Sequence, residues 1–233
     1  MSVINIEICT DSLEGALIAQ KYGVKRIELC AALSVGGLTP SFGLIKKCVE
    51  KSSVEVHVMI RPREGDFNYN SIEIDLMKLD IESTKKAGAH GVVFGILDSE
   101  NKISNENKSL VEFSKSLGLE VTFHRAFDFV SDYNSAIQKI IYFKFNRLLT
   151  SGLKPTAIEG LQVISELQAN YGHQIEIMAG SGINETNVSK FVDSGIENIH
   201  FTARKFIKVS SKLSMGNNMI IDEDKIKNII KNI

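Results

Sequence analysis

Short runs rich in β-branched and apolar residues alternate with longer amphipathic stretches along this chain. In stretches such as 13–19 and 76–87, apolar residues recur every three or four positions, which is the spacing of an amphipathic helix. Gly23, Gly88 and Gly118 each follow such a stretch, where a left-handed cap favours glycine. The predicted strands are 3–8, 26–29, 55–60, 91–94, 120–124, 147–150, 175–178 and 198–201.

Eight strand–helix units in 233 residues average about 29 residues each, a length that suits a compact βαβ crossover. Regular alternation of strand and helix predicts a parallel sheet. An open doubly wound sheet would carry a glycine-rich turn after its first strand, and residues 9–12 read Cys-Thr-Asp-Ser. We therefore predict an α/β fold, a TIM-type (β/α)8 barrel, as a single domain over 1–233. Residues 205–223 are expected to form an extended loop before the last helix.

Alternation within each strand separates an apolar face from a polar face. The apolar face, with residues such as Ile8, Leu29 and Val58, is expected to pack beneath the helices. The other face places these residues in the barrel lumen: Glu7, Cys9, Glu28, Cys30, His57, Met59, Arg61, His124, Met178 and His200. Burying so many ionisable groups costs free energy unless they pair with one another or bind something. Two interpretations stay open, namely a paired structural network and a functional pocket at the C-terminal ends of the strands.

Composition narrows the class of protein. The formal net charge is −1, so the chain has no basic field to attract nucleic acid and no polybasic segment to hold a membrane surface. No apolar run reaches the roughly 18 residues of a membrane span, and the N-terminus lacks the features of a signal peptide. Three cysteines are too few and too scattered for a disulfide framework, and Cys48 fits a small core residue. These features predict a cytoplasmic protein.

Charged residues in the lumen suggest an enzyme. The candidate catalytic residues are Glu28, Arg61 and His124, because an arginine, a carboxylate and an imidazole together can bind an anionic or carbonyl substrate and move a proton. We expect His124 to titrate near neutral pH. The substrate class would be a small sugar or sugar phosphate, handled by an isomerase or an aldol-type lyase. No lysine lies at an inward position, so a Schiff base has little support, and no motif indicates an organic cofactor.

Two further binding sites are conceivable in this lumen. The turns after the seventh and eighth strands occupy the usual phosphate-binding corner of the fold. Its candidate anion-binding residues are Gly180, Ser181, Gly182 and Arg204. The other site would hold a hard divalent ion between Glu7, Glu28 and His124.

Several phrases resemble the copper homeostasis protein CutC family, in order from about residue 6 to residue 204. They are C-T-D-S at 9–12, R-I-E-L-C at 26–30, G-G-L-T-P-S at 36–41, M-I-R-P-R-E-G-D-F at 59–67, G-V-V-F-G at 91–95, T-F-H-R-A-F-D at 122–128, L-T-S-G at 149–152 and A-I-E-G at 157–160. The chain departs from the family at His90, usually aspartate, and at Ser181, usually glycine. The resemblance implies a β/α barrel and a cytoplasmic homodimer or homotetramer. Apolar residues over 137–145 also favour a homo-oligomer.

In this family a cysteine pair at the positions of Cys9 and Cys30 is the proposed Cu(I) site. Cu(I) prefers thiolate and thioether ligands. Both cysteines end neighbouring strands on the inward face, and adjacent strands lie roughly 4.8 Å apart. Met59 could add a thioether. The alternative is that the two cysteines only fill space in the core. The chain thus reads as a Cu(I)-binding protein or as a barrel enzyme.

Overall fold

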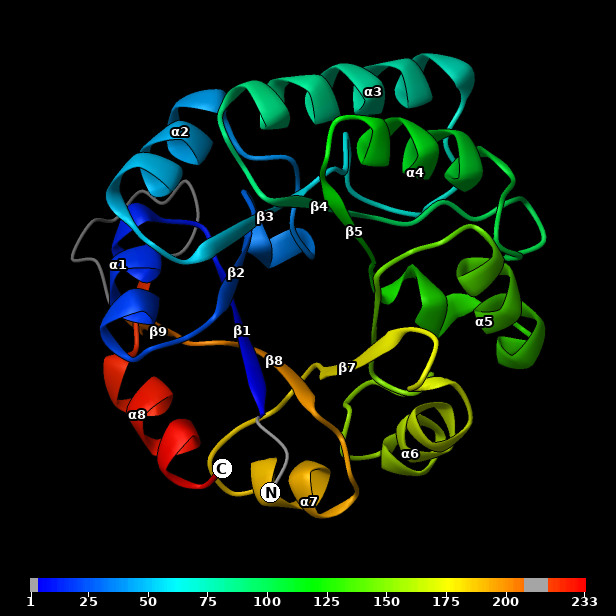
Figure 1. The fold of residues 1–233 in the computed structure, drawn as a ribbon. Helices are drawn as coiled ribbons and strands as arrows, with labels where there is room; N and C mark the ends of the chain where they lie inside the picture. The colour runs from blue at the N-terminus through cyan, green and yellow to red at the C-terminus, as the bar shows by residue number, and fades with distance from the viewer. Residues whose placement is uncertain (1–3, 208–217) are drawn as a thin grey trace, which may run out of the picture.

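In a computed structural model of the chain, which describes residues 4–207 and 218–233, eight parallel strands close into a barrel (Figure 1). Neighbouring strands are consecutive in the sequence, and β8 pairs with β1 to complete the circle. The barrel strands are β1 Asn5–Thr10, β2 Arg26–Leu29, β3 Glu55–Met59, β4 Gly91–Phe94, β5 Glu120–Phe123, β6 Arg147–Thr150, β7 Glu176–Gly180 and β8 Asn198–Thr202. The predicted (β/α)8 barrel is therefore confirmed.

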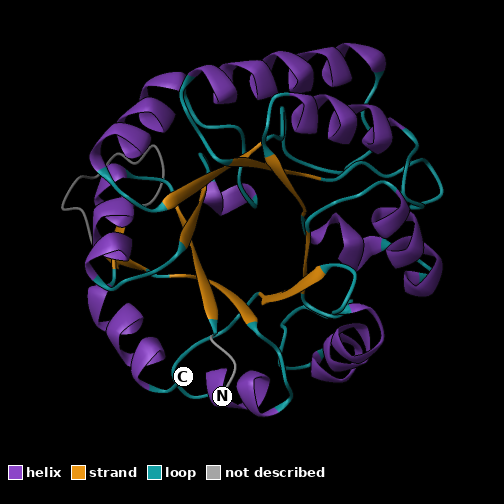
Figure 2. Ribbon diagram, viewed as in Figure 1, coloured by secondary structure: helices purple, strands orange, loops and turns teal. Residues whose placement is uncertain are grey.

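Helices surround the barrel on its outside (Figure 2). They are α1 Leu13–Lys21, α2 Phe42–Lys51, α3 Ser71–Lys86, α4 Glu106–Ser116, α5 Tyr133–Tyr142, α6 Leu161–Tyr171, α7 Val188–Asp193 and α8 Glu223–Lys231, with short 3-10 helices η1 Leu33–Val35 and η2 Arg125–Phe129. Local signals fix several of their starts. Ser12 accepts a hydrogen bond from the Gly15 amide at the start of α1, and Asn70 forms a capping box with Glu73 at α3. None of the described helices has both the length and the apolar character needed to cross a membrane.

The two faces of the strands separate as the alternation predicts. Ile8, Leu29 and Val58 belong to the large apolar layer between the strands and the helices. Cys9 and Met59 lie in a separate small cluster, which also contains Cys30 and Val93. The inner surface of the barrel is therefore distinct from the core that holds the helices in place.

The region predicted as an extended loop at 205–223 contains regular structure. Strands β9 Arg204–Ile207 and β10 Asn218–Ile221 pair in antiparallel fashion, and α8 already begins at Glu223. Residues 208–217 of the predicted loop lie outside the described residues. The expectation was wrong for the flanking segments, because apolar residues such as Phe206 and Ile220 occur there within short extended runs that can pair.

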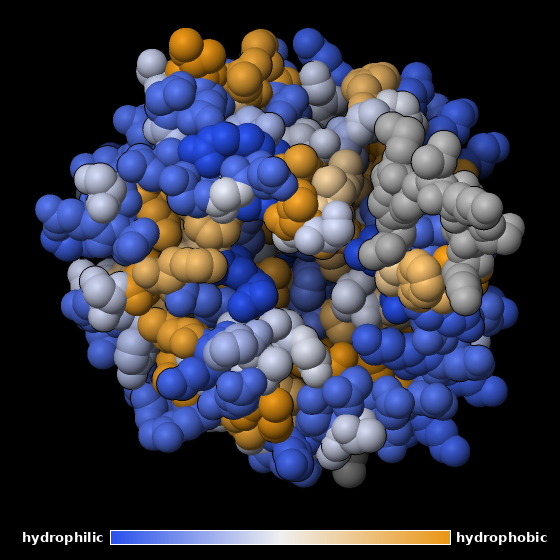
Figure 3. Space-filling view, turned by 180° about the vertical axis from the view of Figure 1, so that it is seen from behind, coloured by the Kyte–Doolittle hydropathy of each residue, from blue (hydrophilic) through white to orange (hydrophobic). Residues whose placement is uncertain are grey.

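The apolar stretch 137–145 is mostly buried, although Tyr142 at the end of α5 is 70% exposed. Its apolar residues Ile137, Ile140 and Phe143 are buried under α5, because helical spacing turns them toward the barrel. A different helix exposes apolar side chains, since Ile72, Leu76 and Leu79 of α3 are 71%, 47% and 59% exposed. Hydrophobic side chains are visible at the top of Figure 3, over the position of α3 in Figure 1.

Candidate functional site

A cavity of about 580 Å³ opens at the C-terminal ends of the barrel strands. The space-filling view from behind Figure 1 shows a hollow near the centre of the molecule (Figure 3). The lining includes most of the predicted site residues, namely Cys9, Glu28, Arg61, His124, Ser181 and Arg204. Barrel closure thus brings together side chains from β1 and β2 and from the segments that follow β3, β5, β7 and β8.

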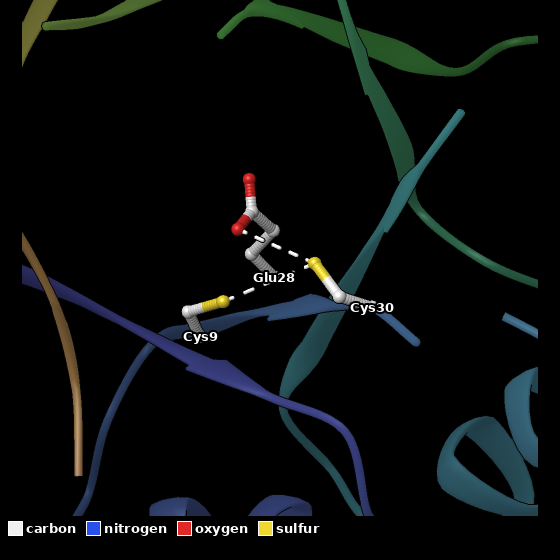
Figure 4. Close-up of side chains that lie close together, drawn as sticks. All are labelled: Cys9, Glu28 and Cys30. Carbon is white, nitrogen blue, oxygen red and sulfur yellow. Dashed lines mark hydrogen bonds between the residues drawn. The ribbon is translucent and has the colours of Figure 1, made fainter. Parts of the chain in front are cut away.

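Two thiols lie side by side near the ends of β1 and β2, where Cys9 lines this cavity and Cys30 is fully buried next to it. The Sγ atoms of Cys9 and Cys30 are 3.9 Å apart, and the Cys30 thiol donates to Oε2 of Glu28 at 3.5 Å. Figure 4 shows the three side chains directed toward one another. All three cysteines of the chain are free thiols, and Cys48 is buried in the outer core as predicted. The expected convergence of Cys9 and Cys30 is observed.

Burial keeps these thiols protonated. The hydrogen bond with Cys30 and the loss of solvent raise the pKa of Cys9 well above its ordinary value. The hydrogen bond with Cys9 acts to lower the pKa of Cys30, but burial and the charge of Glu28 raise it to about 12. A cation that binds both sulfurs must therefore displace their protons.

A buried ion-pair network lies on β1, β2 and β8 beneath the thiols. Glu7, which is 0% exposed, accepts hydrogen bonds from Nε of Arg26 and, on its other oxygen, pairs with Nδ1 of His200 at 2.8 Å. Burial acts to raise the pKa of Glu7, but Arg26 and His200 lower it far below its usual range. Burial acts to lower the pKa of His200, but Glu28, Cys9 and Glu7 raise it well above its ordinary value. The interpretation of the polar lumen as a paired structural network is therefore correct for Glu7.

Glu28 is only partly satisfied. Its Oε2 accepts from Cys30 and lies 3.8 Å from Nε2 of His200, while Oε1 is buried and has no hydrogen-bond partner in the described part of the chain. Burial raises the pKa of this carboxyl group, because the ionised form is poorly solvated. An ordered water or a bound ligand in the cavity can satisfy this oxygen.

Arg61 holds loops together. Its Nη1 donates to the carbonyls of Val35 and Gly37 at 2.9 and 3.0 Å, and Nη2 donates to Gly65 at 2.9 Å. Both terminal nitrogens of the arginine that was expected to bind an anionic or carbonyl substrate therefore already donate to backbone carbonyls. Nε is a buried donor with no partner among the residues the structure describes, and Nη2 keeps a second N–H. Arg61 fixes the loops that follow β2 and β3, which form one wall of the cavity.

His124 is a neutral hydrogen-bond donor. Its Nδ1 accepts from the Ala126 amide at the start of η2, so the proton of the neutral ring resides on Nε2. Burial and the charge of Arg61 lower its pKa to about 3. The expectation that His124 titrates near neutral pH was wrong, because enclosure by protein outweighs the local hydrogen bond. Nε2 is buried and without a partner within residues 4–207 and 218–233.

The corner after β7 and β8 has a distinctive backbone. Ser181 and Gly182 line the cavity with φ of +89° and +73°, a region that glycine tolerates better than serine. The Ser181 hydroxyl donates to the Pro155 carbonyl at 2.9 Å. Arg204 pairs with Asp11 at 2.6 Å, which leaves its Nε without a partner in the described chain. Gly180 does not line the cavity and instead packs against His200.

Some groupings differ from those predicted. No hydrogen bond joins Glu28 to Arg61 or His124 among the described residues, although all three line one cavity. The predicted hard-ion set of Glu7, Glu28 and His124 is wrong in its third member. The ligand atoms that lie within 4.8 Å of one another belong to Glu7, Glu28 and His200. The sequence did indicate that His200 points inward from the last strand. Its partners become apparent only when β8 pairs with β1 to close the barrel.

Comparisons with known proteins agree with this architecture. The family model for CutC matches residues 4–205. A CutC family protein from Glaesserella parasuis is 39% identical, with 99% of each chain covered, and one from Bacteroides thetaiotaomicron is 42% identical, with 96% of this chain and 92% of the relative covered. The crystal structure of a protein named for copper homeostasis, CutC from Streptococcus agalactiae, has a TM-score of 0.80 and 33% identity, covering 85% of this chain and 98% of that one.

More distant structures share only the fold. Phosphoribosylanthranilate isomerase from Pyrococcus furiosus has a TM-score of 0.62 at 16% identity, with 98% of each chain covered. The family match spans nearly all of the barrel, and the relatives are similar over most of their own length. The chain therefore belongs to the CutC family.

Proposed function

We propose that this chain is a copper homeostasis protein that binds Cu(I) through Cys9 and Cys30 at the C-terminal mouth of the barrel. The observation that carries the proposal is the 3.9 Å separation of two free thiols beside an open cavity. Cu(I) is a soft ion and selects thiolate and thioether ligands. Membership of the CutC family and the name of the Streptococcus agalactiae protein support the same function.

The geometry suits one ion between the two sulfurs. A metal–thiolate bond of roughly 2.3 Å, as zinc forms, allows two sulfurs on one ion to lie up to about 4.6 Å apart. The observed distance of 3.9 Å is shorter, so both thiolates can reach one ion without movement of the strands. The thioether of Met59 packs in the same small cluster and offers a further soft ligand. Free thiols of this kind persist in a reducing compartment, which supports a cytoplasmic location.

A competition titration against a Cu(I) chelator under reducing conditions tests the proposal. The unmodified protein should take up about one Cu(I) per chain, and the Cys9→Ser/Cys30→Ser variant should lose this binding. Cys48→Ser is the matched control, because Cys48 is also a buried thiol but lies in the outer core. Equal Cu(I) affinity of the double variant and the control would show that Cys9 and Cys30 only fill space.

A second candidate function is catalysis on a small sugar or sugar phosphate, as an isomerase or aldol-type lyase. It is favoured by three residues of the cavity lining, each of which has a buried polar atom without a partner in the described part of the chain. These atoms are Oε1 of Glu28, Nε2 of His124 and Nε of Arg204. The carboxylate can orient a hydroxyl or take a proton, and His124 can donate a hydrogen bond to a carbonyl oxygen. Arg204, with Ser181 and Gly182, would hold the anionic group of the substrate.

Thermal melting with inorganic phosphate and a panel of sugar phosphates tests this second function. A ligand that raises the melting temperature of the unmodified protein should fail to do so in Arg204→Gln. Lys205→Gln is a suitable control, since Lys205 is a neighbouring cation whose side chain is half exposed and does not line the cavity. No response to any member of the panel would count against the enzyme and leave the Cu(I) proposal intact.

A further inference from the structure

The two thiols share their site with an imidazole and a carboxylate. The ligand atoms of Cys9, Glu28 and Cys30 lie within 4.8 Å of one another, and Nε2 of His200 is 3.8 Å from Oε2 of Glu28. Glu28 belongs to both this group and the group of Glu7, Glu28 and His200, so four potential ligands of three chemical kinds lie around one carboxylate.

His200 is held in the orientation of a metal ligand. Its Nδ1 faces Oε1 of Glu7 at 2.8 Å, and the other oxygen of Glu7 accepts from Arg26. This arrangement fixes the imidazole ring and leaves Nε2 facing Oε2 of Glu28, 3.8 Å away. A carboxylate that accepts from one ring nitrogen while the other binds metal is the usual support of a histidine ligand. Gly180 lets the ring lie there, because a Cβ at this position would be 3.1 Å from Cδ2 of His200.

We propose that these groups form one mixed site for a borderline divalent cation such as Zn²⁺. Its ligands are Cys9, Glu28, Cys30 and His200, and Glu7 is a positioning residue that orients the imidazole. The inference rests on the proposed function, because it uses the same thiol pair. It adds the carboxylate of Glu28 as a hard donor and the imidazole of His200 as a borderline donor. Zn²⁺ accepts sulfur, imidazole nitrogen and carboxylate oxygen in a tetrahedral arrangement. Cu(I) needs only the sulfurs.

Proton balance follows from the groups present. The thiols of Cys9 and Cys30 lose their protons when the cation binds, and His200 gives up the proton on Nε2 while keeping the one directed at Glu7. Two thiolates and the Glu28 carboxylate then carry three negative charges against the two positive charges of the cation, so the occupied site with neutral His200 has a net charge of −1. Oε1 of Glu28, which has no partner in the part of the chain that is described, is also available to the cation.

Parallel titrations with Zn²⁺ and Cu(I) test the mixed site. Glu28→Gln and His200→Gln should each weaken Zn²⁺ binding by more than tenfold and leave Cu(I) binding unchanged. Glu7→Gln should weaken Zn²⁺ by roughly 10–100-fold, the usual effect of losing a supporting group. Glu176→Gln is the carboxylate control, since Glu176 is at the opposite end of β7 and is half exposed. Zn²⁺ affinity that is the same in Glu28→Gln, His200→Gln and the control overturns the inference.

A second measurement uses the unmodified protein, so that it does not depend on the folding of any variant. Protein labelled with ¹⁵N-histidine and loaded with ¹¹³Cd²⁺ should show a one-bond coupling between the metal and one ring nitrogen of His200. Absence of this coupling overturns the role of His200. Cu(I) binding without Zn²⁺ or Cd²⁺ binding would refute the mixed site alone, and failure to bind any of the three ions would refute the proposed function as well.

Discussion

Replacing Arg26 by methionine should strongly destabilise the protein. Arg26 is 1% exposed and pairs with Glu7, which is 0% exposed. The substitution keeps an unbranched side chain of comparable length but leaves the Glu7 carboxylate without its main counter-charge in the interior. Removing one partner of a buried ion pair costs about 3–5 kcal/mol. For a domain of this size that loss corresponds to a fall of roughly 6–20 °C in melting temperature.

The effect should depend on pH in a defined direction. In the unmodified protein Glu7 has a lowered pKa, so its contribution to stability is present above its ordinary pKa and is lost only as the pH falls through the lowered value. In Arg26→Met, burial dominates and raises the pKa of Glu7, which makes the variant less stable as the pH rises. The difference between the two proteins should therefore narrow between about pH 7 and pH 4.

Urea and thermal denaturation of a small set of variants will measure this effect. The double variant Glu7→Gln/Arg26→Met should recover most of the lost stability, because no buried charge remains unpaired. Lys21→Met is the matched control, as it breaks the pair between Lys21 and Glu223 at the surface, where the side chains are 63% and 39% exposed. If Arg26→Met melts no lower than Lys21→Met, or if Glu7→Gln restores nothing, the reasoning from burial is wrong.

Three further predictions concern other parts of the fold. The pKa of His124 is lowered from 6.5 to about 3, so between these values the unfolded chain binds a proton that the folded chain does not. The stability advantage over His124→Asn should fall by about 1.4 kcal/mol per pH unit below neutrality in denaturation curves, and a constant difference would contradict the burial of this ring. We propose that the chain forms a homo-oligomer through the exposed apolar face of α3. Leu76→Lys should then lower the molecular mass measured by light scattering. A monomeric mass for the unmodified protein would refute the proposal. We also propose that the chain is one domain, so fluorescence and circular dichroism should give coincident unfolding transitions.

The barrel was predictable because two periodicities repeat along the chain. Residues of β1 to β3 alternate between apolar and polar, and closure leaves only one face that can be covered by helices. The same alternation places Cys9 and Cys30 on the inner face of neighbouring strands, where their sulfurs are found 3.9 Å apart. Side-chain direction in a strand is a local property, so sequence suffices to predict it.

Partner choice among inward side chains was not predictable. Arg61 faces the cavity as expected. The backbone carbonyls that accept hydrogen bonds from its guanidinium belong to loops whose path the sequence does not reveal. His124 was expected to titrate near neutral pH, yet its environment depends on packing against Phe67 and Arg61 from β3 and the loop beyond it. The partnership of His200 with Glu7 requires the register between β8 and β1, which is set only when the barrel closes.

The pairing of β8 with β1 has a consequence for how the site comes into being. Glu7 and His200 are 193 positions apart, and a chain made from its N-terminus presents Cys9 and Cys30 long before the imidazole has been synthesised. A cation held by all four donors would join the first and last strands across the seam of the barrel. Bound metal should then slow amide hydrogen exchange at β1 and β8 more than at β4 and β5. The bound ion would therefore stabilise the closed barrel in addition to being the ligand that the protein binds.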